Sequence, residues 1–396
     1  MVQQASSLFP TYARFPITLV KGEGSRLWDD QGKEYIDLMA GLAVTNLGHA
    51  PEVVKEKLVA QLDQLWHVSN LFHIPNQEKL AKLLTDNSCA DAVFFCSTGA
   101  EANEAAIKLA RRYSQKVLGE NRYEIITFHQ SFHGRTLATL TATGQEKVQE
   151  GFYPLPEGFV YADYNDLASV EKLISERTCA VMLEMVQAEG GVIPADPAFV
   201  KALAELCKER GLLLIVDEIQ TGMGRTGKLF AYEHYGIEPD IFTLAKGLGS
   251  GFPIGAMLGN AKVSPAFSAG SHGSTFGGTP IATAAAIATV EYMLNEKIPQ
   301  RAAELGEWTV KTLREKLAGN PLVEEVRGEG LLIGIVCKQS AAELIAEIHE
   351  AGVLVVSAGP QVVRLLPSLV IPKEDLQKGL DVVCDVLARK ASALVQ

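Results

Sequence analysis

The residues in this chain whose types and positions best suit catalysis are one carboxylate and one amine, each placed where an apolar run ends. Asp217 follows the run Leu212–Val216, and Lys246 follows the run Ile241–Ala245. A buried carboxylate is costly unless it meets a cation or hydrogen-bond donors, and a buried lysine tends to lose its proton and become nucleophilic. In a doubly wound sheet the carboxyl ends of the strands open onto one crevice. We therefore expect Asp217 and Lys246 to face the same crevice.

Two interpretations of this pair are open when only the two residues are considered. Pyridoxal phosphate requires a lysine that binds its aldehyde and an acidic partner that keeps its ring nitrogen protonated, and Lys246 with Asp217 supplies both. The alternative is a structural Asp–Lys ion pair, because structural charge networks also perturb buried groups. The pair alone does not decide between them.

A candidate phosphate site lies where the stretch Ser97–Lys108 follows the run Val93–Cys96. Ser97 or Thr98 can cap a helix that carries a small apolar face, and Gly99 lets the backbone come close to a ligand. The free N–H groups and the dipole at a helix start favour a phosphate. A capped helix without a ligand has the same pattern, and taken alone this plainer interpretation is favoured.

Two other patterns suggest chemistry that we do not expect here. Residues 222–227 fit GxGxxG, but they do not directly follow a strand and no helical pattern begins at Gly227. Leu229 also stands where a P-loop needs a hydroxyl, so we expect a flexible glycine loop. His129 and His133 lie in a loop-like stretch and no HExxH motif occurs, so we expect no metal site.

The elements that must position these residues alternate along the middle of the chain. Apolar runs at 92–96, 124–128, 179–185, 212–218, 241–245 and 256–259 alternate with helical patterns near 100–117, 167–177 and 197–210. This order indicates an α/β fold with a largely parallel sheet. Patterns after residue 299 suit a smaller α+β domain, and the first fifty residues include a hairpin. We expect an N-terminal segment, 1–50, that belongs to the small domain, a large cofactor-binding domain, 51–299, and a C-terminal small domain, 300–396.

Composition limits the classes of partner. The 396 residues are 47% hydrophobic and 21% charged, which is ordinary for a globular protein. The formal net charge is −11 and no basic run occurs, which argues against nucleic-acid and anionic-membrane partners. We expect no signal peptide and no membrane span. The six cysteines lack metal-ligand spacing, so we expect them to be reduced residues of a cytoplasmic protein.

Six segments, in this order along the chain, resemble the class III, or ornithine-type, pyridoxal-phosphate aminotransferases. They are residues 97–105, 131–136, 181–191, 216–227, 244–247 and 272–280, and together they span most of the chain. The resemblance implies fold type I, with a mostly parallel seven-stranded sheet in a large domain and a small α+β domain built from both chain ends. Within the family the similarity is strongest to the members that act on N2-acetyl-L-ornithine, which share residues 40–44.

The resemblance also implies a role for each matching cofactor residue. Lys246 would carry the cofactor covalently and then move the proton at the substrate carbon, and Asp217 would pair with the ring nitrogen. The other cofactor contacts would be Phe132 and Ile219 on the two ring faces, Gln220 at the ring hydroxyl, and Thr98, Gly99 and Ala100 at the phosphate. Thr275 would complete the phosphate site from the partner subunit of a homodimer.

The substrate residues follow from the same resemblance. Arg135 would bind the α-carboxylate through a two-point fork, which lysine cannot replace. Glu189 would neutralise Arg364 for the amino donor and then release it for 2-oxoglutarate. Ser274 would lie beside Thr275 at the substrate. Leu42 stands where ornithine-specific members tend to place a tyrosine, and it can pack against an acetyl group but cannot hydrogen-bond a free ammonium.

We therefore expect a transaminase that converts N2-acetyl-L-ornithine and 2-oxoglutarate to N-acetyl-L-glutamate 5-semialdehyde and L-glutamate, in arginine biosynthesis. Other donors within the family are ornithine, 4-aminobutyrate and succinyl-diaminopimelate. The alternatives from other classes are a non-catalytic regulatory protein that binds the cofactor and a nicotinamide-dependent dehydrogenase that uses the glycine loop. Thr279, where the family more often has asparagine, and the short Gly48–Pro51 stretch depart from the family pattern.

Overall fold

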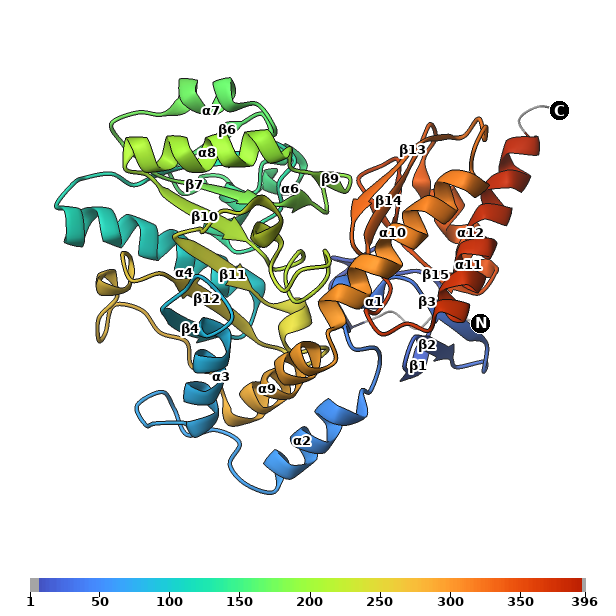
Figure 1. Cartoon of the computed structure of the whole chain (residues 1–396), viewed down its shortest axis with the longest axis horizontal. Helices are drawn as coiled ribbons and strands as arrows, with labels where there is room; N and C mark the ends of the chain where they lie inside the picture. Colours follow the sequence, from blue (N-terminus) through green and yellow to red (C-terminus); the bar gives the residue numbers. More distant parts are fainter. Residues whose placement is uncertain (1–6, 394–396) are drawn as a thin grey trace.

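A seven-stranded sheet forms the centre of the computed structural model, which describes residues 7–393 (Figure 1). The strands, in spatial order, are β4 (Ala92–Cys96), β12 (Gly255–Gly259), β11 (Ile241–Leu244), β10 (Leu213–Asp217), β7 (Thr178–Glu184), β5 (Glu124–Phe128) and β6 (Phe159–Ala162). β12 runs antiparallel to both of its neighbours, β4 and β11. The other neighbouring pairs, from β11 through β10, β7 and β5 to β6, are all parallel. The predicted α/β class with a largely parallel sheet is therefore confirmed.

Helices cover both faces of this sheet because alternate strand residues bury apolar side chains on opposite faces. On one face, Ile125, Met182 and Ile215 pack with apolar residues of α4 (Gly99–Arg112). On the other face, Ile126, Leu183 and Val216 join the core that contains α8 (Pro197–Arg210) and α9 (Pro280–Asn295). The remaining helices of this region are α2 (Glu52–Leu62), α3 (Pro75–Thr85), η1 (Tyr113–Leu118), α5 (Leu137–Ala142), α6 (Glu146–Gln149), α7 (Leu167–Leu173), η2 (Ala231–Tyr235), η3 (Lys246–Leu248) and η4 (Ser264–Ala266). Its remaining strands, β8 (Val186–Gln187) and β9 (Ile193–Pro194), pair with each other.

The start of α4 is fixed by a capping box. The Thr98 hydroxyl accepts a hydrogen bond from the Glu101 N–H at 3.2 Å, and the Glu101 carboxylate accepts from the Thr98 and Ser97 N–H groups at 3.1 and 2.6 Å. Such reciprocal bonds satisfy donors that a helix start leaves unpaired. The N–H groups of Gly99 and Ala100 remain at the helix start, where an anion can accept from them.

The two chain ends build the second part of the molecule together. β1 (Leu19–Glu23), β2 (Arg26–Asp29) and β3 (Glu34–Asp37) form one sheet with β15 (Val353–Leu354). A second sheet has the order β13 (Val323–Glu329), β14 (Leu332–Cys337), β17 (Val362–Leu365) and β16 (Val356–Ala358). The helices here are α10 (Ile298–Lys316), α11 (Ala341–Glu350) and α12 (Lys373–Ala393). Figure 1 shows the N-terminal strands (blue) beside the C-terminal helices (red), where Arg26 pairs with Asp375 at 2.6 Å.

The short element α1 (Ala40–Ala43) is a left-handed turn. The φ angles of Ala40, Gly41, Leu42 and Ala43 are 45°, 59°, 68° and 60°. An L-residue in this region costs roughly 1–2 kcal/mol, so other contacts must hold the turn. One Asp37 carboxylate oxygen accepts from the N–H groups of Met39 and Ala40, both at 2.9 Å. The turn brings the following residue, Val44, to the cavity described below.

The loop of residues 222–227 is buried, so the expectation of a flexible glycine loop is wrong. Arg225 is fully buried and donates to the carbonyl oxygens of Leu331 and Pro367 at 3.0 and 2.6 Å and to the Asn46 side chain at 2.6 Å. The loop therefore joins the end of β10 to segments from both chain ends. Within residues 7–393, no helix is long and apolar enough to cross a membrane.

Candidate active site

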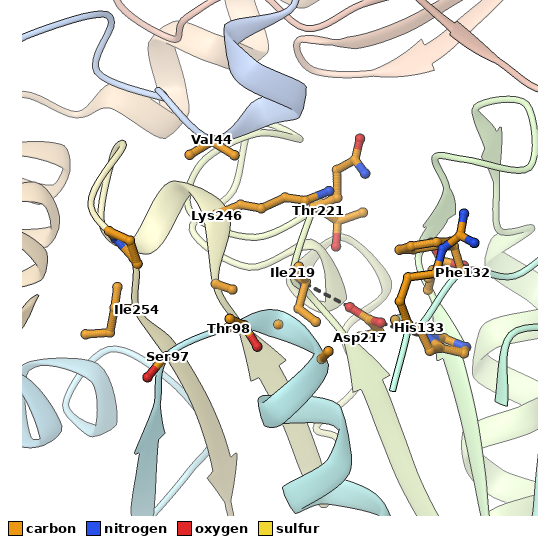
Figure 2. Close-up of a pocket in the computed structure, with 18 of the residues that line it drawn as sticks. Val44, Ser97, Thr98, Phe132, His133, Asp217, Ile219, Thr221, Lys246 and Ile254 are labelled. Atoms are coloured by element: carbon orange, nitrogen blue, oxygen red, sulfur yellow. Dashed lines mark hydrogen bonds and ion pairs between the residues drawn. The ribbon is translucent and has the colours of Figure 1, made fainter. Parts of the chain in front are cut away.

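A cavity of about 400 Å³ opens at the carboxyl ends of the central strands, where α/β sheets bind their ligands. Residues that follow β4, β10 and β11 line it together with residues of the 131–135 loop. Figure 2 shows the Lys246 side chain extending into the cavity from one side, with Phe132 and His133 on the opposite side. The expected meeting of Asp217 and Lys246 in one crevice is therefore observed.

Asp217 is buried and surrounded by hydrogen-bond donors. One carboxylate oxygen accepts from Asn103 Nδ2 and lies next to His133 Nδ1, both at 2.8 Å, and the other accepts from the Ile219 N–H at 3.0 Å. Among the ion pairs of the described residues, none joins Asp217 to Lys246. The alternative of a structural Asp–Lys ion pair is therefore wrong, and the partners of the Asp217 carboxyl group are Asn103, His133 and the Ile219 N–H instead.

Lys246 follows β11 in a left-handed backbone conformation, with φ of 39°. Its Nζ has no hydrogen-bond or ion-pair partner in the part of the chain that the structure describes. Removal of the ammonium from water lowers the pKa of Lys246 to about 8, because burial disfavours the charged form. A lysine with a lowered pKa supplies a free amine near neutral pH, which is the form that attacks an aldehyde.

The helix start predicted to hold a phosphate lies in the same cavity. Thr98, Gly99 and Ala100 all line it, and so does Ser97. A Cβ atom at Gly99 would lie 2.9 Å from Ile219, so a larger residue would push against the wall of the cavity. Ile219 and Phe132 are both lining residues, as expected for side chains that pack on the faces of a flat ring.

Arg364 and Glu189 form an ion pair at the edge of the site. Their Nη1–Oε1 and Nη2–Oε2 distances are 2.7 and 3.2 Å. The Gln220 side chain bridges the pair, accepting from Arg364 Nη1 at 3.0 Å and donating to Glu189 Oε1 at 3.2 Å. Burial alone would raise the pKa of Glu189, but the Arg364 guanidinium lowers it overall. Gln220, predicted at a ring hydroxyl, thus also binds the two residues predicted to form the substrate switch.

Arg135 lies at the rim, with its guanidinium carbon 5.6 Å from the centroid of the Phe132 ring. Arg135 and Phe132 line both the main cavity and an adjoining hollow of about 430 Å³, whose wall also includes Glu189. Arg135, which has no ion-pair partner in the described part of the chain, therefore shares the wall of this hollow with Glu189, the partner of Arg364. Two arginines beside one site suit a substrate that carries two carboxylates.

Arg364 lines neither cavity itself and contacts the site through Gln220 and Glu189. Three further predicted site residues are also not brought to these cavities within one chain. Thr275 is exposed and Ser274 half-buried, on the loop that precedes α9. Leu42 is half-buried in the left-handed turn, near the lining residue Val44. None of the three lines either cavity in the described part of this chain.

Sequence reasoning missed several lining residues. Among them, Glu184, the last residue of β7, carries an ionisable carboxyl group. The rule that singled out Asp217, a polar residue at the carboxyl end of a buried strand, would also have found it. His133 was considered only as a metal ligand, whereas it contacts Asp217. The other missed residues are Val44, Gly134, Thr221, Ala245, Gly251, Phe252, Pro253 and Ile254.

The proteins to which this chain is similar agree with the chemistry that the cavity suggests. The class-III aminotransferase family model covers residues 9–387. Acetylornithine aminotransferases of Oceanobacillus iheyensis and Bacillus subtilis are 52% and 48% identical, over 94% and 98% of this chain and 94% and 99% of their own lengths.

Solved structures give the same result. The N-acetylornithine aminotransferase of Stenotrophomonas maltophilia K279a has a TM-score of 0.84 and 37% identity, covering 96% of this chain and 98% of the other. The ornithine aminotransferase of Toxoplasma gondii, which has PLP at partial occupancy in its active site, has a TM-score of 0.93 and 33% identity, covering 97% and 92%. The fold is fold type I of the PLP-dependent aminotransferases. The chain belongs to the class-III aminotransferase family.

Proposed function

We propose that this transaminase moves the δ-amino group of N2-acetyl-L-ornithine to 2-oxoglutarate, giving N-acetyl-L-glutamate 5-semialdehyde and L-glutamate, as in arginine biosynthesis. The observation that carries the proposal is the Arg364–Glu189 ion pair, because Glu189 lines the same hollow as Arg135 and this hollow adjoins the Lys246 cavity. Arg364 is a second cation, and Glu189 can either pair with it or leave it free to bind a carboxylate. Such a cation suits a site that must accept both an ω-amino donor and a dicarboxylate. Relatives 45–52% identical are named acetylornithine aminotransferases, which supports the choice of donor.

The cavity residues fit pyridoxal 5′-phosphate as the cofactor. Asp217 offers a fixed negative charge for a protonated ring nitrogen, and Lys246 offers an unpaired amine with a lowered pKa. The N–H groups at the start of α4 suit the phosphate, and the Gly99 position is too crowded for a larger residue. When bound, the cofactor supplies a ring that accepts the electron pair left on the substrate carbon.

Each step at the substrate has a residue placed for it. Lys246 would hold the aldehyde end of the cofactor and, once displaced by substrate, take the proton from the substrate carbon and return it as general base and acid. Arg135 would bind the substrate carboxylate. For the donor, Glu189 would stay on Arg364; for 2-oxoglutarate, Glu189 would swing away so that Arg364 binds the second carboxylate.

The active unit would be a homodimer in which Thr275 and Ser274 complete the site of the partner subunit and Leu42 packs against the acetyl group of the donor. Support comes from the surface next to Thr275, because Phe276 is 65% exposed and the nearby chain carries other exposed apolar side chains. They are Leu65, Trp66, Leu71 and Phe72. The His67 ring packs against Phe276 in a tilted arrangement, with the ring centroids 5.5 Å apart, and so connects this apolar segment to the Thr275 loop.

Two further features belong to the same proposal. Residues 51–299 would form the large cofactor-binding domain, with 1–50 and 300–396 forming the small domain, since β3 and β15 share a sheet. The enzyme would work in the cytoplasm with small-molecule substrates and without nucleic-acid or membrane partners. The six free cysteines suit such a reducing compartment.

The test is a panel of amino donors with 2-oxoglutarate as acceptor. We expect kcat/KM to be highest for N2-acetyl-L-ornithine, by at least about tenfold over ornithine, which is roughly 1.4 kcal/mol of transition-state binding. The comparison includes 4-aminobutyrate and succinyl-diaminopimelate. A higher kcat/KM for any of these three donors would overturn the assignment of the donor.

A further inference from the structure

Two buried carboxyl groups lie side by side in the cofactor cavity. Glu184 ends β7 and Asp217 ends β10, and the two residues are register partners in adjacent parallel strands. Both line the cavity, and both side chains are almost fully buried. Two buried carboxylates at register positions of adjacent strands repel each other when both are ionised, so their surroundings must favour one charge over the other.

The hydrogen bonds distinguish the two groups. Asp217 meets Asn103, His133 and the Ile219 N–H, three partners that stabilise a negative charge. Within the described residues, the Glu184 carboxyl has one hydrogen bond, from the Phe132 N–H to Oε2 at 3.1 Å. Glu184, which has fewer hydrogen-bond donors around its carboxyl group, is therefore the favoured site of a proton.

The charges around Glu184 agree with this assignment. Burial first, and then the charge of Asp217, raise the pKa of Glu184 well above its usual value. The hydrogen bond from the Phe132 N–H lowers this pKa, Glu189 raises it and Lys246 lowers it, but burial and Asp217 outweigh the two opposing effects. The Tyr164 hydroxyl donates to the backbone carbonyl of Glu184 at 2.6 Å, so it contributes no bond to the carboxyl group.

We propose that Glu184 works as a neutral carboxylic acid that positions the Phe132–Arg135 loop and so allows a substrate carboxylate to reach Arg135. Its oxygen fixes the Phe132 N–H, and the Phe132 ring lies beneath the Arg135 guanidinium at 5.6 Å. An ionised Glu184 would add a second negative charge to the cavity that the substrate carboxylate enters. This role rests on the proposed function for the substrate, but the protonation of Glu184 does not depend on the donor.

The first test measures protonation by thermal unfolding and needs no substrate. Glu184→Gln keeps an oxygen for the Phe132 N–H and cannot ionise. Glu184 keeps its proton in the folded wild type and releases it in the unfolded chain at a lower pH. Wild-type stability should therefore fall as pH rises from the pKa of Glu184 in the unfolded chain to its raised pKa in the folded protein. We expect the Tm of Glu184→Gln to rise relative to wild type between about pH 5 and about pH 8. A Tm difference that does not change with pH would overturn the neutral state.

The second test measures positioning with 2-oxoglutarate, an acceptor shared by the donors considered above. In the wild type, ionisation of Glu184 at high pH should raise KM, because the added negative charge repels the substrate carboxylate. Glu184→Gln should keep KM within about threefold of wild type at neutral pH and should lose this rise at high pH. Glu184→Met, which offers no oxygen to Phe132, should raise KM by at least about tenfold while kcat changes less. A wild-type KM for Glu184→Met, or an unchanged high-pH rise in Glu184→Gln, would overturn the positioning role.

Glu218→Gln is the matched control. Glu218 is also buried beside Asp217, and burial raises its pKa to about 7, but it binds Thr221 and the Tyr232 N–H and does not line the cavity. Its substitution should change the pH dependence of Tm and leave the pH dependence of KM as in wild type. Loss of the KM rise in this control as well would assign the effect to general electrostatics and overturn the proposal. A donor other than acetylornithine would refute the proposed function while leaving the Tm result intact.

Discussion

The Arg364 guanidinium and the Glu189 carboxylate lie in a two-point ion pair, with both nitrogen–oxygen distances at or below 3.2 Å. Arg364 is fully buried, whereas the Glu189 side chain is 27% exposed. The arginine therefore has the fixed position and the glutamate faces the entrance. Removing a glutamate from a buried arginine is costly unless another anion takes its place, and the second carboxylate of 2-oxoglutarate is such an anion.

Glu189→Ala tests this relationship. Without Glu189, Arg364 is free to bind a carboxylate at all times, so the site should react more readily with glutamate and less readily with the ω-amino donor. We expect the ratio of glutamate to donor half-reaction rates to rise by about tenfold or more, measured by stopped-flow absorbance of the cofactor. Glu189→Gln, which keeps the shape, should shift the ratio in the same direction. Equal changes in both half-reactions would mean that Glu189 has only a structural role.

Leu42→Tyr tests the donor end of the site. A tyrosine hydroxyl can hydrogen-bond the free α-ammonium of ornithine, which leucine leaves unpaired. The preference of kcat/KM for acetylornithine over ornithine should therefore narrow, by about threefold to tenfold. Leu42→Phe is the control, since it adds the ring without the hydroxyl and should keep the preference. A wild-type ratio in Leu42→Tyr would show that residue 42 does not contact the donor.

The lowered pKa of Lys246 predicts the pH dependence of cofactor capture. The amine must be free to attack the aldehyde, and its pKa of about 8 means that the reactive fraction rises with pH and levels off above about 8. The rate at which cofactor-free protein develops visible absorbance with pyridoxal phosphate should follow this curve. Lys246→Ala should give no covalent product after borohydride treatment. A capture rate that does not change between about pH 7 and about pH 9 would contradict the lowered pKa.

Mixing two inactive variants tests whether Thr275 serves the partner subunit. Lys246→Ala and Thr275→Ala each damage both sites of their own dimers. In a mixed dimer, one site combines an intact Lys246 with an intact Thr275 from the other chain. Random exchange should then recover about a quarter of wild-type activity. If Thr275 acts within its own chain, every site stays damaged and mixing recovers nothing.

Much of the fold could be predicted from the sequence because its strands are buried on both faces. The runs at 92–96 and 124–128 agree with β4 and β5, since uninterrupted apolar residues mark such strands. β6 was missed because this edge strand is partly exposed and short. The helical pattern predicted to reach residue 177 ends at Leu173. The apolar run at 353–356, which has the pattern of one strand, is split between β15 and β16 of different sheets.

The candidate active site could likewise be predicted only in part from the sequence. Asp217, Lys246 and the helix start at Gly99 could be placed together because parallel strands end at one edge. The left-handed turn at residues 40–43 could not, because only one of its four residues is a glycine and contacts with Asp37 hold the rest. The buried loop around Arg225 was also not predictable, since its partners come from residues 46, 331 and 367.

Transfer of the δ-nitrogen is the central claim, and isotope labelling tests it most directly. The loaded enzyme is given N2-acetyl-L-ornithine labelled with nitrogen-15 at the δ-position, together with unlabelled 2-oxoglutarate, and the glutamate formed is analysed by mass spectrometry. We expect the amount of labelled glutamate to equal the amount of semialdehyde produced. Labelling the acetylated α-nitrogen instead should give unlabelled glutamate. Unlabelled glutamate from the δ-labelled donor, or no glutamate at all, would contradict the central claim.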